Sequence, residues 1–311
     1  LQADVPVGFY LSGGLDSSSV VCVAQSLHRE GRVAKPGFET FSLVYPGLRC
    51  DESGYIQEVG RMWGIKSNAV DAADPDVSCY TEQVRRYYDF PYPPNGVMHE
   101  PVMALARAKA VRVLLTGVGG DQWLTGSLNH HADLLRRFRI ADLIRQSRFD
   151  SQVLSDLGEP ASPLFLGVRY GLWPLLPLAA QRAIKWALMG ERDGVPRWIS
   201  SQFARRIQLS ERLRKKKTAG QRFSSVVRRD LSLYLTSGWS SLQRELTDRY
   251  GSWFGIELRH PFLDRRVIEF AMALPEEQRW QRNETKFVLR RAMRGLLPDT
   301  VRQRVTKADF S

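Results

Sequence analysis

The sequence is poor in cysteine and has no apolar run long enough to cross a bilayer. Its 311 residues include three cysteines, Cys22, Cys50 and Cys79. Three cysteines without paired spacing support neither a disulfide framework nor a zinc module, so we expect a reducing, cytoplasmic setting. Because no stretch of about 20 apolar residues occurs, we expect no membrane-spanning helix.

An initiator methionine and a signal peptide are also missing. The chain begins at Leu1 and reaches the apolar segment 7–11 within a few residues. A start placed directly against a core strand is typical of a fragment. We therefore expect that a further segment precedes Leu1, which this sequence does not describe.

Acidic residues are fewer than basic ones, and the net charge is +12. One interpretation is a polyanionic partner such as RNA. The other is an arginine-rich, solvated surface around a nucleotide pocket. Because the basic residues are spread along the chain and are not interleaved with stacking aromatics, we favour the second interpretation. Nucleic acid is therefore not an expected partner.

The most informative stretch is the glycine-rich segment 10–21, YLSGGLDSSSVV. The apolar run 7–11 predicts a buried strand, and the apolar run 20–24 predicts a helix. A strand, a glycine-rich turn and a helix together direct backbone N–H groups and a helix dipole at an anion. No Gly-Lys-Ser/Thr follows the glycines, so this is not a Walker A loop. It resembles the Ser-Gly-Gly-x-Asp-Ser loop of the ATP pyrophosphatases, which cut ATP between its α- and β-phosphates.

Two carboxylates accompany this loop and a second one like it. Asp16 lies in the first loop, where it would repel a phosphate unless a cation such as Mg²⁺ bridged them. Asp121 ends the glycine-rich segment 116–121, which follows a predicted strand. Because both loops follow strands of one predicted parallel sheet, we expect the two carboxylates to share a cation. The pyrophosphate would be held by the glycines and hydroxyls of the first loop, namely Ser12, Gly13, Gly14, Ser17 and Ser18.

The order of elements predicts an α/β fold. Strands are expected at 7–11, 38–45, 65–70 and 111–116, alternating with helices at 52–63, 81–88 and 100–109. Such alternation is typical of a parallel sheet with helices on both faces. From residue 130 onward the periodicity is helical, with helices expected at 132–144, 179–189, 198–213 and 224–248. The segment 215–220 is expected to be an exposed connection. We therefore predict an α/β nucleotide-binding core at 1–130, followed by a mainly helical part at 131–311.

Four ordered blocks resemble the synthetase domain of the asparagine synthase family. They are the first loop with DVPVG ahead of it, LTGVGGDQW at 115–123, ELRHPFLD at 257–264, and NETKFVLR at 283–290 with RVTKADF at 304–310. The resemblance implies a parallel-sheet core of the ATP-pyrophosphatase, or adenine nucleotide alpha-hydrolase-like, type. It also implies an ATP- and Mg²⁺-dependent ligase that adenylates a carboxylate and transfers it to ammonia or an amine.

The resemblance assigns roles to matching positions. It implies that the backbones of Leu11, Leu43 and Gly117 frame the adenine and that Thr116 lies near the ribose. It implies that Asp16 and Asp121 bind Mg²⁺ and that Lys307 reaches the phosphates. From the residues alone, Asp121 could instead be a turn or cap residue, and Lys307 a solvated lysine near the chain end. Arg259 and Asp264 are predicted to be structural, with Asp264 capping the following segment.

Two positions of the second motif depart from the family pattern, and the segment TGS at 125–127 replaces the Gly-Gly-Tyr that usually follows it. Val118 and Gln122 stand where asparagine synthetases usually carry glutamates, the first of which is tied to the amino-acid substrate and the incoming ammonia. A valine cannot pair with an ammonium, so we expect aspartate not to be the natural or best substrate. Family relatives that close β-lactam rings or lasso-peptide macrolactams adenylate other carboxylates.

The nitrogen donor and the competing functions stay open at the level of sequence. The family normally has an N-terminal glutaminase domain, and nothing in this chain matches it. We expect free ammonia or a substrate amine as donor, or ammonia from a glutaminase domain before Leu1. Two other interpretations are an ATP pyrophosphatase that modifies tRNA and a nucleotide-binding relic without ligase activity. The sequence does not indicate an oligomeric state.

Overall fold

The computed structural model describes residues 3–33, 38–72, 76, 78–89, 94–156, 160–189, 195–196, 198–218, 223–281 and 284–305. The chain forms two compact units. The first comprises residues 1–125, 241–274 and 286–311, and the second comprises 126–240 and 275–285. Among the described helices, none has the length and apolar character needed to cross a membrane.

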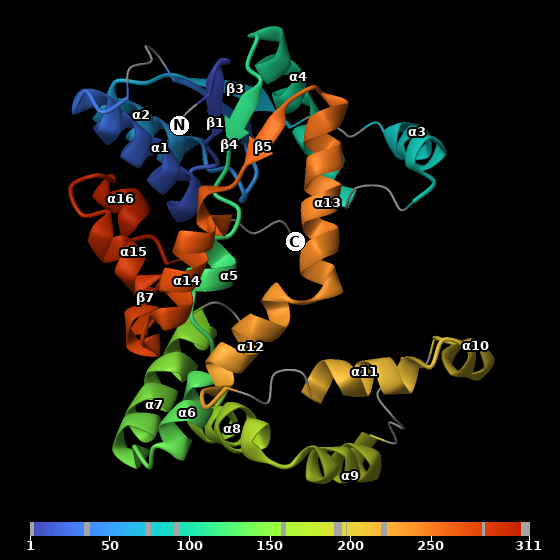
Figure 1. Ribbon diagram of the computed structural model, residues 1–311. Helices are drawn as coiled ribbons and strands as arrows, with labels where there is room; N and C mark the ends of the chain where they lie inside the picture. The colour runs from blue at the N-terminus through green and yellow to red at the C-terminus, as the bar shows by residue number, and fades with distance from the viewer. Residues whose placement is uncertain are drawn as a thin grey trace. The chain divides into compact units, whose positions relative to one another are not determined.

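A five-stranded parallel sheet forms the centre of the first unit (Figure 1). The strand order is β3-β2-β1-β4-β5, and every neighbouring pair runs parallel. The strands are β1 (Val7–Tyr10), β2 (Glu39–Val44), β3 (Ser67–Asp71), β4 (Val113–Leu115) and β5 (Glu257–Arg259). The predicted α/β class with a parallel sheet is confirmed. Four strands were expected from the sequence, and the fifth, β5, was not, because three residues are too few to show a period-two pattern.

Helices cover both faces of this sheet. β1 and β4 are continuously buried along almost their whole length, as expected for parallel strands covered on both faces, and successive side chains point to opposite faces. One core joins Phe9 and Leu115 to α1, α2 and α16, and the other joins Phe41 and Leu114 to α4 and α13. The helices that lie wholly or mostly in this unit are α1 (Leu15–Arg29), α2 (Ser53–Trp63), α3 (Ser78–Tyr87), α4 (Glu100–Ala108), α5 (Gly120–Leu124), α13 (Gly238–Trp253), α14 (Arg265–Ala273), α15 (Phe287–Ala292) and α16 (Asp299–Arg302).

The second unit is built mainly of helices. They are α6 (His130–Arg136), α7 (Ile140–Asp156), α8 (Pro163–Leu166), α9 (Leu178–Met189), α10 (Ser201–Arg206), α11 (Leu209–Thr218) and α12 (Val226–Leu235). A short antiparallel hairpin, β6 (Trp280–Gln281) with β7 (Glu284–Thr285), completes it.

Three predicted helices are each broken in two. The segment 132–144 spans α6 and α7, which are separated at Phe138, where φ is +55°. The segment 198–213 breaks between α10 and α11 beside Gln208, where φ is +51°. The segment 224–248 divides into α12 and α13. A helical period continues across such a break, so periodicity alone does not reveal the left-handed residue that ends a helix.

The predicted exposed connection at 215–220 is wrong for most of its length. Helix α11 continues to Thr218, and residues 219–220 lie outside the described residues. Lysine has a good intrinsic helix propensity, so a run of lysines prolongs a helix as readily as it forms a loop.

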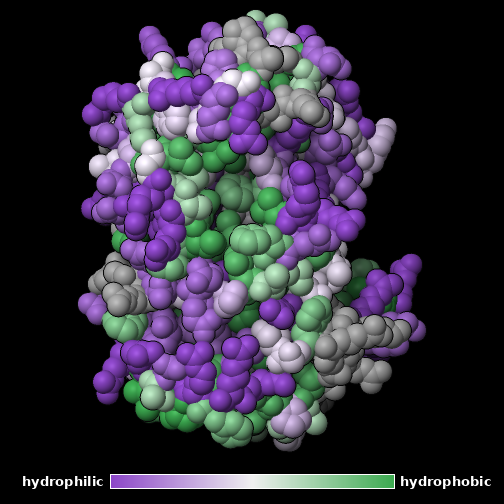
Figure 2. All heavy atoms as spheres, turned by 60° about the vertical axis from the view of Figure 1, so that its left-hand side comes forward, coloured by the Kyte–Doolittle hydropathy of each residue, from purple (hydrophilic) through white to green (hydrophobic). Residues whose placement is uncertain are grey.

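The surface is mixed in character. Figure 2 shows one face, on which hydrophilic side chains are widespread and hydrophobic side chains reach the surface between them. Exposed apolar side chains are common on globular proteins, and we assign no role to them.

Candidate active site at the carboxyl edge of the sheet

The first glycine-rich loop joins β1 to α1. The N–H of Leu11 donates to the Phe41 carbonyl over 2.8 Å, and the Ser42 hydroxyl donates to the Leu11 carbonyl over 2.6 Å. These bonds fix the end of β1 against β2. Helix α1 then begins after Gly14, with no side-chain cap. Its first N–H groups therefore meet no capping side chain, which is the arrangement that suits an anion.

The hydroxyl groups of this loop bond mainly to one another. Ser12 Oγ lies 2.8 Å from Ser17 Oγ, and the Ser12 N–H donates to Ser17 Oγ over 3.2 Å. Ser12 keeps some exposed surface, Ser17 is buried, and Ser18 has none. The predicted hydroxyl donors therefore do not share one exposed face. Ser12 is the most accessible of the three, and Ser18 reaches no solvent.

The second glycine-rich loop packs directly onto the first. A Cβ added to Gly117 would lie 2.5 Å from the Ser17 nitrogen. A Cβ added to Gly120 would lie 2.4 Å from the carboxyl carbon of Asp16. Both distances are far below a van der Waals contact. Only glycine allows this approach of the two loops, and the approach brings Asp121 close to Asp16.

We expect the Gly120→Ala variant to be destabilised by about 1–3 kcal/mol and to lose nucleotide affinity, because its methyl group would displace the Asp16 carboxylate. Urea unfolding and nucleotide titration would measure the two effects. Gly54→Ala is the matched control. Gly54 lies in α2 with nothing within 4 Å of the added methyl, so this variant should be as stable as the parent or more so by up to about 1 kcal/mol. Equal behaviour of the two variants would show that the loops do not depend on this contact.

A buried lysine joins the two carboxylates. Lys286 Nζ lies 2.5 Å from Asp16 Oδ2 and 2.7 Å from Asp121 Oδ1. The Lys286 side chain is 8% exposed, that of Asp16 is 14% exposed and that of Asp121 is 48% exposed. The structure therefore brings Asp16 and Asp121 together at one edge of the sheet. It places a positive charge between them and leaves the Asp121 side open to solvent.

Lys286 lies in the block at 283–290 that resembles the family, but the sequence alone did not predict a role for it. Lys286 has a left-handed backbone, with φ +55°, and it precedes the first residue of α15. Its side chain is buried by two loops that lie more than 160 residues earlier in the chain. The available signal was a single lysine between polar residues and the apolar start of a helix, and that signal is weak.

Thr116 organises the turn after β4. The Val118 N–H donates to Thr116 Oγ1 over 3.2 Å, and Thr116 Oγ1 lies 2.6 Å from His260 Nδ1. Burial lowers the pKa of His260 below its usual value. The ring is therefore neutral near pH 7, and the tautomer of the ring sets whether Nδ1 accepts a hydrogen bond from the Thr116 hydroxyl or donates one to it. This bond ties the second loop to the segment after β5.

His260 makes the free energy of unfolding depend on pH, in a direction that follows from its lowered pKa. The unfolded chain regains the ordinary pKa of about 6.5 and binds a proton more readily than the folded chain. The free energy of unfolding should therefore be unaffected above that pH and should fall as the pH drops below it. In His260→Asn, the side-chain amide can donate to or accept from the Thr116 hydroxyl and does not titrate, so the loss of stability on acidification should be smaller. Urea unfolding at about pH 7 and about pH 5.5 measures this, and equal losses in parent and variant would refute it.

The remaining predicted residues fall into two groups. Leu11 and Leu43 are buried at the ends of β1 and β2, and Gly117 is partly exposed. Val118 and Gln122 are exposed, Val118 by 49%. An apolar side chain is thus exposed at the surface of the second loop, three residues before Asp121 in the chain.

Arg304 is held beside the first loop. Arg304 forms an ion pair with Glu52, and its guanidinium lies 4.3 Å from the centre of the Tyr55 ring. Glu52 and Tyr55 are also the residues that a Cβ on Gly13 would meet. Lys307 lies outside the described residues, three positions after Arg304.

The block at 257–264 contains the helix cap that the sequence predicts. Arg259 pairs with Glu257 on β5, with 2.8 Å between Nε and Oε1. Asp264 caps α14 and accepts the Arg266 N–H over 2.9 Å. Leu263 and Phe262 pack where a Cβ on Gly119 would lie, so this block also supports the second loop.

Comparison with known proteins agrees with these motifs. The family model for asparagine synthase matches residues 1–311. Asparagine synthetase [glutamine-hydrolyzing] 1 of Bacillus subtilis is 25% identical over 98% of this chain and 46% of its own length. Amidase chyE of Penicillium rubens is 31% identical over 43% of this chain and 21% of its own length. The chain spans less than half the length of these relatives.

Among solved structures, the U34-tRNA thiolase NcsA from Methanococcus maripaludis aligns over 83% of this chain and 85% of its own. The two are 13% identical, and the TM-score is 0.28, which is too low to support any inference.

The match of the family model along the whole chain, together with the two loops and the carboxylates they bring together, shows that the chain belongs to the asparagine synthase family.

Proposed function

We propose that this chain is the synthetase part of an ATP-dependent, amide-forming ligase. It would adenylate a carboxylate and transfer the acyl group to ammonia or an amine. The observation that carries the proposal is the cluster of Asp16, Asp121 and Lys286 beside the uncapped start of α1. Family membership favours this function over the modification of tRNA. Two intact carboxylates bonded to a buried lysine favour a working enzyme over a relic.

The residues of the cluster fit Mg²⁺. Two carboxylate oxygens from separate loops already hold one cation, the Lys286 ammonium, and carboxylate oxygens are the protein ligands that Mg²⁺ prefers. Asp16 and Asp121 would hold the ion, and the exposed side of Asp121 leaves room for phosphate oxygens and water. When bound, Mg²⁺ would neutralise the charge that develops on the phosphates.

The other proposed roles follow from the loops. The pyrophosphate would lie on the backbone of Ser12, Gly13 and Gly14 and on the first turn of α1 at Ser17. Ser18 is fully buried and donates its N–H to the Gly14 carbonyl, so it would support this turn from behind. The adenine would meet the backbones of Leu11, Leu43 and Gly117, with Thr116 near the ribose. Lys307 would stabilise the negative charge on the reacting phosphorus, and Lys286 would hold the two carboxylates in position.

The reaction would proceed in two balanced steps. A substrate carboxylate oxygen attacks the α-phosphorus of ATP, the bond to the bridging oxygen breaks, and pyrophosphate leaves. The nitrogen of ammonia or an amine then attacks the acyl carbon and loses a proton. AMP departs with the oxygen that came from the carboxylate, and an amide remains. The chain's own part is to orient the carboxylate in line with the leaving pyrophosphate and to supply positive charge near the reacting phosphorus.

The substrate is proposed from Val118 and Gln122. An exposed valine in the loop that leads to Asp121 favours an apolar or large acyl group over aspartate, since valine offers neither a charge nor a hydrogen bond. Natural-product amide or macrolactam formation is therefore the form of this chemistry that we expect. Several relatives are named as asparagine synthetases. Asparagine synthesis by this chain would require Val118 to be tolerated at the position where those enzymes usually carry a glutamate.

The nitrogen would come from a substrate amine, from free ammonia, or from a glutaminase domain outside this chain. The three cysteines are free thiols, which supports the proposal that the protein works in a reducing, cytoplasmic compartment.

ATP–pyrophosphate exchange with Mg²⁺ tests this function. The panel should contain aspartate, other amino acids, fatty and aromatic acids, and short peptides with free carboxyl termini. We expect exchange that depends on a particular carboxylate and is weak with aspartate. Exchange with aspartate alone would contradict the substrate proposal, and absence of exchange with every carboxylate despite ATP binding would contradict the ligase activity of this chain.

A further inference from the structure

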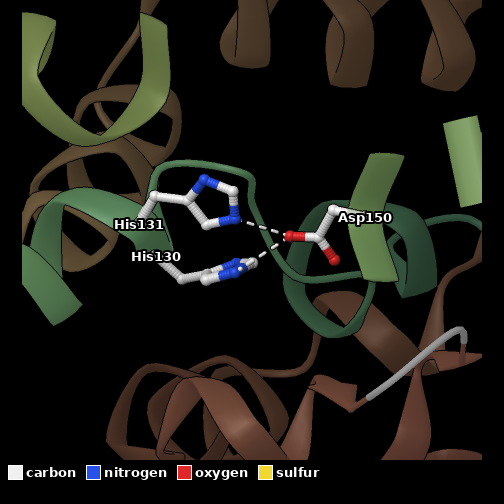
Figure 3. A group of neighbouring side chains, drawn as sticks. All are labelled: His130, His131 and Asp150. Atoms are coloured by element: carbon white, nitrogen blue, oxygen red, sulfur yellow. Dashed lines mark hydrogen bonds and ion pairs between the residues drawn. The ribbon is translucent and has the colours of Figure 1, made fainter. Parts of the chain in front are cut away.

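Three buried side chains of the second unit converge away from the proposed site. His130 and His131 are the first two residues of α6, and Asp150 lies on α7 (Figure 3). The Nε2 atoms of both histidines approach the same oxygen, Asp150 Oδ2, at 2.6 Å from His131 and 3.2 Å from His130. All three side chains are buried, and those of His131 and Asp150 have no exposed surface.

The hydrogen bonds of His130 fix where its proton lies. Its Nδ1 is 2.7 Å from the Ser127 carbonyl oxygen, and a carbonyl can only accept. Nδ1 therefore carries a hydrogen, and in the neutral ring Nε2 carries a lone pair. That nitrogen is buried, and although it lies 3.2 Å from Asp150 Oδ2, the approach does not have the geometry of a hydrogen bond. In the neutral ring a lone pair therefore faces a carboxylate oxygen, and either a proton or a metal ion between the two atoms would relieve this repulsion.

The three atoms form a ligand set for a transition metal. Their ligand atoms all lie within 4.8 Å of one another. Two imidazole nitrogens and one carboxylate oxygen are the donors that Zn²⁺ and its neighbours prefer. Two of the three ligands have outer partners of the usual kind: the Ser127 carbonyl accepts from His130, and Gln146 donates to Asp150 Oδ1 over 2.8 Å.

Glu276, a nearby acidic residue of the same unit, is not expected to bind this metal ion. Glu276 accepts the Ser127 N–H over 2.7 Å and pairs with Arg279, with 2.6 Å between Oε2 and the guanidinium. Its charge is therefore already matched. The Asp150 carboxylate is contacted by His130, His131 and the side-chain amide of Gln146. Among the described residues, no arginine or lysine side chain forms an ion pair with it.

We propose that His130, His131 and Asp150 bind one divalent transition-metal ion, for which Zn²⁺ is the probe. The ion would join the start of α6 to the middle of α7. Because the three ligands are buried, its role would be structural, and it would be independent of the ATP and Mg²⁺ proposed for the first unit.

The test uses the full chain, stripped with a chelator and titrated with Zn²⁺ in excess Mg²⁺, which occupies the Asp16 and Asp121 carboxylates. We expect one Zn²⁺ per chain, a higher unfolding temperature with Zn²⁺, and, after Co²⁺ replacement, visible absorption typical of an ion with nitrogen and oxygen ligands. The variants Asp150→Asn and His131→Asn should lose the ion. Gln146→Leu keeps all three ligands and should weaken binding by about 10–100-fold. His28→Gln, in the other unit, should bind as the parent does.

Three results would overturn the proposal. One is Zn²⁺ binding of unchanged strength in Asp150→Asn and His131→Asn. Another is loss of the Zn²⁺ site in Asp16→Asn, which would place the ion at the other carboxylates. The third is no bound Zn²⁺ in the parent, with nitrogen NMR showing both ring nitrogens of His130 protonated, so that a proton occupies the place of the metal. If the ligand variants fail to fold, the graded effect of Gln146→Leu still decides between these outcomes.

Discussion

A Lys286→Met variant is expected to lose ATP–pyrophosphate exchange by at least about 10²–10³-fold, the loss typical of removing one preorganised electrostatic group. The Lys286 ammonium lies 2.5 Å and 2.7 Å from the two carboxylates and is almost fully buried. Methionine has a similar length and no charge. Asp16 and Asp121 would then repel each other and move apart, and the site would lose the geometry that we propose for MgATP.

Stability separates this role from simple misfolding. Removing one partner of a buried ion pair costs up to about 3–5 kcal/mol, and the exposure of Asp121 reduces that figure here. Mg²⁺ should restore part of the loss, because it supplies positive charge between the same oxygens. We therefore expect Mg²⁺ to raise the unfolding temperature of Lys286→Met more than that of the parent. Lys66→Met, which alters an exposed lysine, is the control and should change neither property. An active Lys286→Met enzyme would refute the role of this lysine.

An Asp16→Asn variant is expected to bind MgATP far more weakly than the parent and to lose about 10²–10³-fold in exchange. The amide keeps the shape of the side chain but lacks the charge that holds a cation. Asp121→Asn should have a smaller effect on stability, because its side chain is 48% exposed whereas that of Asp16 is 14% exposed. Calorimetric titration with ATP, with and without Mg²⁺, measures the loss.

The Mg²⁺ dependence makes this prediction specific. In the parent, Mg²⁺ should strengthen ATP binding, and in Asp16→Asn that gain should be largely absent. Asp4→Asn, at an exposed position, should behave as the parent does. If Asp16→Asn bound MgATP as tightly as the parent, the metal role proposed for this carboxylate would be wrong.

The sequence predicted the sheet and the first loop because their signals are local. Apolar runs bounded by glycine mark β1, β2 and β4, and the Ser-Gly-Gly-x-Asp-Ser pattern lies directly at the start of α1. Four of the five strands and the C-cap at Gly64, where φ is +68°, follow from such signals.

What the sequence did not predict depends on distant contacts. Lys286 forms its two ion pairs only because two loops far away in the chain place Asp16 and Asp121 next to it. β5 is three residues long and is a strand because β4 pairs with it. The breaks near Phe138 and Gln208 rest on a left-handed backbone at residues that rarely adopt it. The approach of His130 and His131 to Asp150 required the packing of α6 on α7.

Transfer of oxygen-18 tests the central claim most directly. The claim is that this edge of the sheet catalyses attack of a carboxylate on the α-phosphorus of ATP. With the carboxylate found by the exchange panel, labelled in both oxygens, the AMP released should carry one labelled oxygen on its phosphorus, seen by phosphorus NMR or mass spectrometry. Label in inorganic phosphate, with ADP as the other product, would mean attack at the γ-phosphorus. Unlabelled AMP would mean that water attacks the nucleotide. Either result would contradict the account.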